Sequence, residues 1–210
     1  MFVKDYMTPS PVTVSPDDLL GDALDLMKKH SIRRLPVVSR GKIVGLVTEQ
    51  DLMKASPSSA TSLSVWEINY LFSKIRIKDM MTKEIFSIKS DTILEEAALI
   101  MQKKQISTLP VLENNKLVGI ITESDIFKAF IDILGLNHPS LRVTLLVEDQ
   151  VGVLKSISEI VDAAGINIVS TIVQRSSDNR VHLILRLATK NAEQVTKIFE
   201  KAGVEVSHIC

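Results

Sequence analysis

The order of apolar and polar positions describes one structural unit that occurs twice along the chain. In each copy, a short extended segment leads into a helix whose apolar residues recur at helical spacing. A strand, a tight turn, a second strand and a second helix follow, which predicts a β-α-β-β-α unit. The strands are expected at 12–14, 35–38 and 43–47 and again at 86–88, 109–112 and 117–121, with the second helices starting at Thr48 and Thr122.

Local signals predict where these elements begin and turn. Asp18 is placed to cap the first helix, and residues 92–95 form a capping box for its counterpart. Residues 40–41 and 114–115 lie between paired strands, and the Gly and Asn residues there tolerate the positive φ of a hairpin turn. Each copy is therefore expected to form a β-hairpin flanked by two helices.

The two copies are a duplication. Residues 3–55 align with residues 77–129 at a constant offset of 74, without a gap, and 21 of the 53 aligned positions are identical. A unit of this size cannot cover both faces of its small sheet alone. Stacked repeats bury such faces against each other, so two units are expected to pack together and leave clefts between them.

A separate segment, residues 57–76, joins the copies. Ser64 and Glu67 form a capping box that predicts a short helix over residues 65–74. Two interpretations exist for the aromatic residues of this helix, Trp66 and Tyr70. They either contribute to a ligand pocket or, as the favoured interpretation, pack against the repeats or a dimer partner.

The C-terminal part has a different pattern, β-α-β-β-α-β, which is ferredoxin-like. Asn191 is the expected N-cap of its second helix, and Gly165 and Gly203 follow the two helices. The chain as a whole is predicted to be α+β. The expected domains are 1–56 and 77–135 for the repeats, 57–76 for the insert, 136–140 for a linker and 141–210 for the last domain.

The sharpest motif is Gly-h-h-Thr-x-x-Asp, where h is apolar, and it ends both copies. It places Thr48 and Asp51, and likewise Thr122 and Asp125, in the first turn of a helix. Free backbone N–H groups there favour an anion, and the Thr hydroxyl can donate a hydrogen bond to a phosphate oxygen. The Asp carboxylate can accept hydrogen bonds from the hydroxyls of a ribose. The same spacing also serves a helix that caps itself. Arg33 and Arg34, which precede a strand, can add charge-assisted hydrogen bonds to phosphate.

With its Met-Thr opening, its Leu-Pro-Val strand and this final motif, the repeat resembles paired CBS domains, also called a Bateman module. The resemblance covers about residues 1–135. It implies clefts that bind AMP, ADP, ATP, S-adenosylmethionine or a related ligand, with no cofactor required. By matching position it assigns ribose contact to Asp51 and Asp125, and phosphate contact to Thr48 and Thr122. The segments from Thr8 to Val12 and from Thr82 to Phe86 would flank the base, largely through backbone groups.

The two clefts are expected to differ. The first copy carries Arg33 and Arg34 where the second has Ser107 and Thr108. A phosphate-rich ligand should therefore prefer the cleft that the arginines face. The sequence does not show which Thr/Asp pair that cleft contains.

The turn into the first helix of the last domain resembles that of the ACT domain. Its Asp-x-x-Gly-x-Leu element begins at Asp149, and the resemblance implies an amino-acid effector near Asp149, Val151 and Gly152. The alternative interpretation is structural: Gly152 permits a tight turn and Asp149 caps the helix.

The full order of two CBS repeats and an ACT domain resembles the acetoin-utilisation B type of bacterial regulatory protein. This predicts a non-catalytic sensor that binds an adenine nucleotide and transmits the effect of binding to the ACT domain or to a regulated protein partner. The resemblance also implies a homodimer and an association with acetoin utilisation. Two alternatives remain open: a ligand-free dimerisation scaffold, and an amino-acid sensor that acts through the ACT domain.

Composition narrows the function classes. Lys plus Arg and Asp plus Glu are 25 each, a balance that argues against a general nucleic-acid binder. The four histidines lack metal-ligand spacing, and the sequence carries no nucleophile or phosphate-loop motif. With a single cysteine, no signal-peptide pattern and no apolar stretch of membrane-spanning length, a cytoplasmic protein without a membrane segment is expected.

Overall fold

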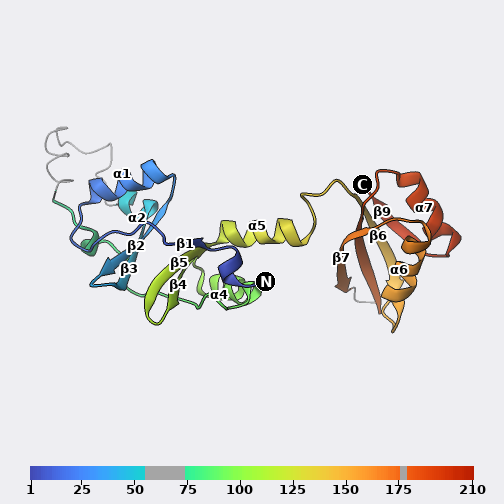
Figure 1. Ribbon diagram of the computed structural model, residues 1–210, viewed down its shortest axis with the longest axis horizontal. Coiled ribbons are helices and arrows are strands. Elements are labelled where there is room, and N and C mark those ends of the chain that lie inside the picture. The colour runs from blue at the N-terminus through green and yellow to red at the C-terminus, as the bar shows by residue number, and fades with distance from the viewer. Residues whose placement is uncertain (55–73, 176–178) are drawn as a thin grey trace. The chain divides into compact units, whose positions relative to one another are not determined.

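The computed structural model describes residues 1–54, 74–175 and 179–210. Within these residues the chain divides into two compact units, Met1–Ile126 and Phe127–Cys210. The capping box at Ser64 and the helix expected to carry Trp66 and Tyr70 lie outside the described residues. Helices and strands are both well represented, so the α+β prediction is confirmed (Figure 1).

The first unit contains the first copy and the second copy as far as Ile126 within α5, and in each copy the elements follow the predicted order. The expected extended segments at 12–14 and 86–88 form single parallel bridges, Val14 to Val37 and Ile88 to Val111, rather than full strands. The first copy comprises η1 (Val3–Asp5), β1 (Thr8–Pro9), α1 (Leu20–His30), β2 (Arg34–Ser39), β3 (Lys42–Thr48) and α2 (Glu49–Lys54). The second comprises η2 (Ile77–Asp79), α4 (Leu94–Lys104), β4 (Thr108–Glu113), β5 (Lys116–Thr122) and α5 (Glu123–Ile133).

The hairpin turns form as expected, because the local residue types suit them. Arg40 and Gly41 have φ values of 49° and 75°, and Asn114 and Asn115 have values of 49° and 62°. Positive φ at both central residues matches the twist of the flanking strands. β2 therefore pairs with β3, and β4 with β5, in antiparallel register.

The predicted caps of the first helices are wrong. The N-cap of α1 is Leu19 and that of α4 is Ile93, and neither forms a side-chain cap. Asp18 instead accepts a 2.7 Å hydrogen bond from the Ser15 backbone. The helix ends use distant backbone partners: the N–H of Leu20 donates to the carbonyl of Ile75, and that of Leu94 to the carbonyl of Met1. Met1 precedes the opening segment of the first copy and Ile75 that of the second, so each helix start depends on chain beside the other copy's opening, which explains why a local capping signal failed.

The opening segments of the two copies are exchanged. Val3 donates to Thr92 across 2.9 Å, and Ile77 donates to Asp18 across 3.0 Å, so each opening docks at the helix start of the opposite copy. β1 pairs with β5 of the second copy. Thr82 forms the corresponding bridge with Leu46 of the first copy.

An ion pair reinforces one of these junctions. Lys78 Nζ donates to Asp17 Oδ1 across 2.8 Å, joining the second copy's opening to the loop before α1. The hydrogen bond from Lys78, and then its positive charge, lower the pKa of Asp17. Both side chains are largely exposed, so the pair adds little stability compared with the backbone bonds beside it.

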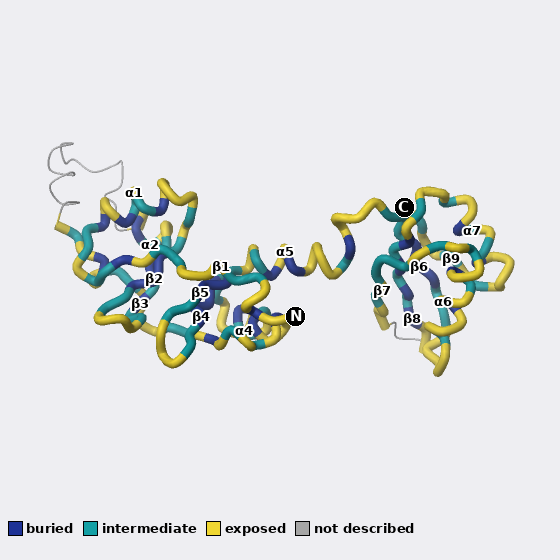
Figure 2. The backbone as a smooth tube through the Cα atoms, viewed as in Figure 1, coloured by how far each residue is buried: buried dark blue, intermediate teal, exposed yellow. Residues whose placement is uncertain are grey.

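The exchange also explains why two parts of the repeat motif occur together. A Cβ placed on Gly45 would lie 2.5 Å from Sδ of Met81, and one on Gly119 would lie closer still to Sδ of Met7. The Gly of each final motif therefore leaves room for the Met of the opposite copy's Met-Thr opening. Ile77, from the second copy, is buried in the core cluster of the first. Figure 2 shows the buried stretches of this unit in dark blue, including parts of β2 and β5.

The second unit forms the predicted β-α-β-β-α-β order after the end of α5. Its antiparallel sheet has the strand order β7-β8-β6-β9. Helices α6 and α7 pack on one face and share a core with the inward side chains of the sheet (Figure 1). The elements are β6 (Leu141–Glu148), α6 (Val153–Ala163), β7 (Ile168–Arg175), β8 (Arg180–Leu187), α7 (Ala192–Lys201) and β9 (Glu205–Ile209).

The caps predicted for this unit hold where the partner is local. Asn191 accepts a 3.0 Å hydrogen bond from the Gln194 backbone and caps α7 as expected. Gly165 and Gly203 follow α6 and α7 with φ values of 67° and 69°. These are the left-handed positions that end a helix without a Cβ penalty.

Thr144 of β6 provides a stability test. The residue is 7% exposed, and its hydroxyl has no hydrogen-bond partner among the described residues. Because valine keeps the branched shape and removes the unsatisfied group, Thr144→Val is expected to stabilise this unit by about 1 kcal/mol. Thermal denaturation should show a rise of roughly 4–8 °C for a unit of this size.

The matched control is Thr171→Val on β7, where the residue is exposed. Its melting temperature is expected to stay within a degree or two of wild type. A lower melting temperature for Thr144→Val would contradict the interpretation of Thr144 as an unsatisfied group.

Candidate functional site

Two clefts lie where the copies meet. The larger, called cleft A, has a volume of about 640 Å³. The smaller, called cleft B, has a volume of about 250 Å³. The residues predicted from sequence divide between them: Thr8, Arg33, Thr122 and Asp125 line cleft A, Thr48, Asp51 and Thr82 line cleft B, and Arg34 lines both.

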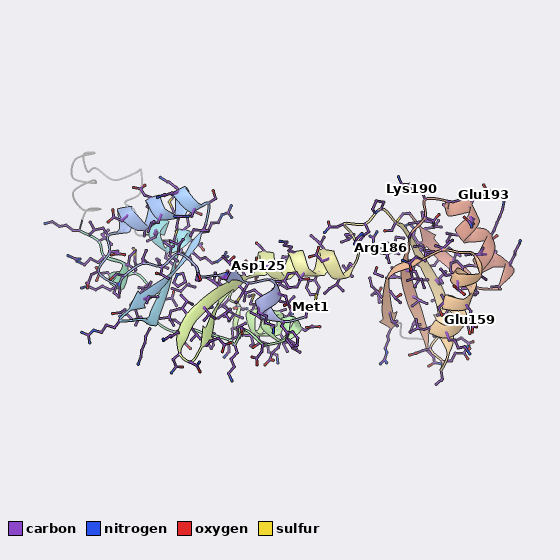
Figure 3. All side chains as sticks on the ribbon, viewed as in Figure 1. Met1, Asp125, Glu159, Arg186, Lys190 and Glu193 are labelled. Atoms are coloured by element: carbon purple, nitrogen blue, oxygen red, sulfur yellow. The ribbon has the colours of Figure 1, made fainter. Side chains whose placement is uncertain are left out.

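The structure answers the question that the sequence left open. Arg33 and Arg34 face the Thr122/Asp125 pair, which belongs to the opposite copy. Thr8 reaches the same cleft because β1 pairs with β5, placing Thr8 opposite Ile120. Figure 3 shows Asp125 near the start of α5. Cleft A is thus built from both copies.

Both Thr/Asp pairs cap their own helices. Asp125 Oδ2 accepts hydrogen bonds from the Thr122 backbone at 2.8 Å and from its hydroxyl at 2.7 Å. Asp51 Oδ2 accepts the same two bonds from Thr48, at 3.0 and 2.7 Å. This confirms the capping interpretation. It uses only one carboxylate oxygen, so Oδ1 of each Asp can still accept a bond from a ligand.

The two arginines are held differently. Arg34 Nη2 donates a 2.8 Å hydrogen bond to Ser107 Oγ, a bond from the first copy to the second. Arg33 Nε lies 3.8 Å from Glu49 Oε2, and the two side chains are 81% and 50% exposed. Such an exposed pair is weak, so the guanidinium of Arg33 can turn to an incoming anion at small cost.

Ser31 of cleft A and Gln105 of cleft B were missed by motif reasoning, whereas the segments from Thr8 to Val12 and from Thr82 to Phe86 contribute lining residues as expected. The offset of 74 would have found Ser31 and Gln105, because it pairs positions that line opposite clefts. The pairs, with the cleft A residue first, are Ser10 and Glu84, Val12 and Phe86, and Ser31 and Gln105. In a duplicated chain, the repeat offset therefore identifies candidate lining residues that lie outside the motifs.

The loop before α6 forms a second candidate site in the other unit. Gly152 is the N-cap with a φ of 93°, so the tight-turn interpretation is confirmed. Asp149 does not cap the helix; its Oδ2 lies 3.9 Å from Nε of Arg175 instead. The capping alternative for Asp149 is wrong because glycine already supplies the turn. Val151 and Gly152 line a cavity of about 630 Å³, and Asp149 lines a smaller one beside it.

Comparison with protein-family models decides the classification. The CBS domain model matches residues 3–58 and 77–132, which together are more than half of the chain. The chain belongs to the CBS domain family. An ACT domain model also matches residues 140–203 of this CBS protein.

Curated relatives match part of this chain. An uncharacterised protein of Methanocaldococcus jannaschii is 32% identical over 136 residues, covering 61% of this chain and 46% of the relative. Inosine-5′-monophosphate dehydrogenase of the same organism is 35% identical over 119 residues, covering 56% of this chain and 21% of the enzyme. The chain thus spans less than half of these relatives, and the match to the dehydrogenase is a CBS-domain match.

Solved structures of other CBS proteins resemble the same part. A Vibrio cholerae protein provisionally described as the acetoin utilization protein AcuB is 34% identical, with a TM-score of 0.54, covering 65% of this chain and 95% of its own. A CBS domain pair in complex with 5′-methylthioadenosine and S-adenosyl-L-methionine is 30% identical, with a TM-score of 0.52, covering 62% and 99%. CBSX2 in complex with AMP is 29% identical, with a TM-score of 0.54, covering 63% and 97%. CBS pairs similar to this one therefore bind adenosine ligands.

The described parts of the chain contain neither a candidate metal site nor a candidate membrane-spanning helix. No cluster of three or more His, Cys, Asp or Glu side chains there is arranged to hold a metal ion. None of the helices described combines the length and apolar character that a bilayer crossing requires.

Proposed function

We propose that this CBS protein is a cytoplasmic sensor that binds a phosphorylated adenine nucleotide in cleft A. One observation carries the proposal: Arg33 and Arg34 from the first copy and Thr122 and Asp125 from the second line the same cleft. Its volume of about 640 Å³ lies within the usual range for small-molecule sites. Similar CBS pairs bind AMP and S-adenosylmethionine, which supports the ligand class.

Each residue has a chemically suited role in this proposal. The free Oδ1 of Asp125 accepts hydrogen bonds from the ribose hydroxyls. The phosphate lies at the start of α5, where the helix N-terminus favours an anion. The Thr122 hydroxyl, which donates to Asp125 in the free protein, turns to donate to this phosphate. Arg33 and Arg34 add charge-assisted bonds to the same phosphate. Thr8 and the residues after it flank the base.

Binding of this kind serves regulation because the ligand bridges both copies. It can shift the protein only as far as it binds one arrangement of the copies better than another. We propose that a homodimer relays this shift to the ACT domain or to a regulated protein partner. The similarity to AcuB supports an association with acetoin utilisation.

Calorimetry on the full chain with AMP, ADP, ATP and S-adenosylmethionine tests the proposal. At least one phosphorylated nucleotide should bind, and Arg33→Ala should weaken its binding about tenfold or more, the usual effect of losing one charge-assisted bond. Lys42→Ala is the matched control, because Lys42 is exposed at the end of the β2–β3 hairpin away from Arg34. Wild-type protein that binds none of the four ligands would instead support a ligand-free scaffold.

A second function is favoured by the geometry of the ACT domain. We propose that an amino acid binds beside Val151 and Gly152, where the left-handed turn opens the cavity in front of α6. A thermal-shift screen of the standard amino acids tests it. A ligand that raises the melting temperature of wild type should have no effect on Gly152→Leu.

A further inference from the structure

Clefts A and B differ in charge as well as in size. Among the described ionisable residues, cleft A is lined by Arg33, Arg34, His30 and a single carboxylate, Asp125. Cleft B is lined by one cation, Arg34, and by two carboxylates, Asp51 and Glu84. Lys104 lies near but not in the lining, with its Nζ 4.6 Å from the centroid of the Phe86 ring. Cleft A is therefore cationic and cleft B anionic.

Two differences between the copies cause this reversal. Arg33 and Arg34 correspond to Ser107 and Thr108 at the offset of 74, so cleft B lacks an arginine pair of its own. Ser10 of cleft A corresponds to Glu84 of cleft B, which adds a carboxylate at the matching position. A phosphate in cleft B would thus meet two negative charges, and a desolvated cleft strengthens that repulsion.

Arg34 connects the two clefts. It lines both, and its 2.8 Å hydrogen bond to Ser107 places the guanidinium at the border between the copies. A phosphate in cleft A pairs with this guanidinium and neutralises the one cation among the described residues that line cleft B. Binding in cleft A thus affects cleft B without any movement of Arg34, because the guanidinium lines both clefts and its charge is neutralised in place.

We propose that cleft B selects an adenosine-type nucleoside without phosphate, while a phosphorylated nucleotide occupies cleft A alone. The nucleoside uses Asp51, whose free Oδ1 accepts ribose hydroxyl bonds as Asp125 does in cleft A. The volume of about 250 Å³ also favours a ligand smaller than a nucleotide. When a phosphate in cleft A pairs with Arg34, cleft B discriminates more strongly against phosphate. The positive charge of Arg34, which would attract a second phosphate, is then neutralised. The proposal rests on the nucleotide function assigned to cleft A.

Calorimetric titration of the full chain with AMP, and then with adenosine at saturating AMP, tests this inference. Wild type should bind one AMP per chain, and adenosine should still bind to the AMP-saturated protein. The reciprocal variants Glu84→Ser and Ser10→Glu exchange the residues at one pair of matched positions. Glu84→Ser should create a second AMP site, and Ser10→Glu should weaken AMP binding to cleft A at least tenfold.

The outcomes separate this inference from the function on which it rests. Two AMP molecules per wild-type chain would overturn the selectivity of cleft B and leave the nucleotide function intact. The selectivity is also wrong if adenosine fails to bind the AMP-saturated protein, or if Glu84→Ser still binds a single AMP. Wild type that binds neither AMP nor any other phosphorylated nucleotide would overturn the proposed function itself. Melting curves of both variants show whether each is folded.

Discussion

Asp125→Asn is expected to weaken AMP binding by about tenfold to a hundredfold. Asparagine has a single acceptor oxygen, so when that oxygen keeps the capping bonds its NH2 group faces the ribose and cannot accept hydrogen bonds from the hydroxyls. Hydrogen bonds to charged groups contribute about 1.5–3 kcal/mol. The substitution is nearly isosteric, and the amide oxygen can still accept the two bonds from Thr122 that cap α5. Calorimetry should therefore report a change in affinity in a protein of normal melting temperature.

Asp91→Asn provides the matched control. It removes the same charge from an exposed residue of the same unit that does not line either cleft. Its affinity for AMP should equal that of wild type. Equal affinities for Asp125→Asn and wild type would show that Asp125 only caps the helix, and the ribose role would then be wrong.

Phe199→Ala is expected to have the largest effect on stability. Phe199 of α7 is fully buried in the core between the sheet and the helices of the ACT domain. Removing a buried aromatic ring typically costs about 3–5 kcal/mol, because the cavity collapses only partly. That is a large fraction of the 5–15 kcal/mol by which a whole domain is usually stable. Hydrogen exchange should show loss of protection in β6, β8 and α7.

The same variant tests whether the two units are independent. The first CBS repeat, with the opening segment of the second, has its own core cluster, which contains no ACT residue. AMP binding by Phe199→Ala should therefore remain close to that of wild type. Phe199→Leu is the conservative control, with an expected cost below about 1.5 kcal/mol. Unchanged protection in Phe199→Ala, or loss of AMP binding, would contradict the assignment of separate cores.

Features determined within a few residues were predictable from the sequence. The turns at residues 40–41 and 114–115 depend on residue types that accept positive φ, and the cap at Asn191 needs a partner only three residues away. The β-α-β-β-α and β-α-β-β-α-β orders follow from apolar periodicity. Each of these signals is contained in one short stretch of chain.

Features that depend on distant backbone were not predictable. The starts of α1 and α4 are satisfied by carbonyls of Ile75 and Met1, which no local pattern reveals. For the same reason the sequence identified Thr122, Asp125 and the arginines as candidates without bringing them into one cleft. Their meeting depends on the exchange of opening segments, a long-range arrangement of backbone hydrogen bonds.

That exchange has a consequence for how such a chain can arise. A single repeat, separated from its copy, would lack both a partner for its opening segment and a cover for the Gly of its final motif. Two identical single repeats could supply these contacts to each other by swapping their openings, as in a domain-swapped dimer. Joining two such repeats in one chain makes the swap intramolecular, so it no longer depends on protein concentration. The duplicated gene is then free to let its halves diverge, and arginines gained in one half change a cleft completed by the other.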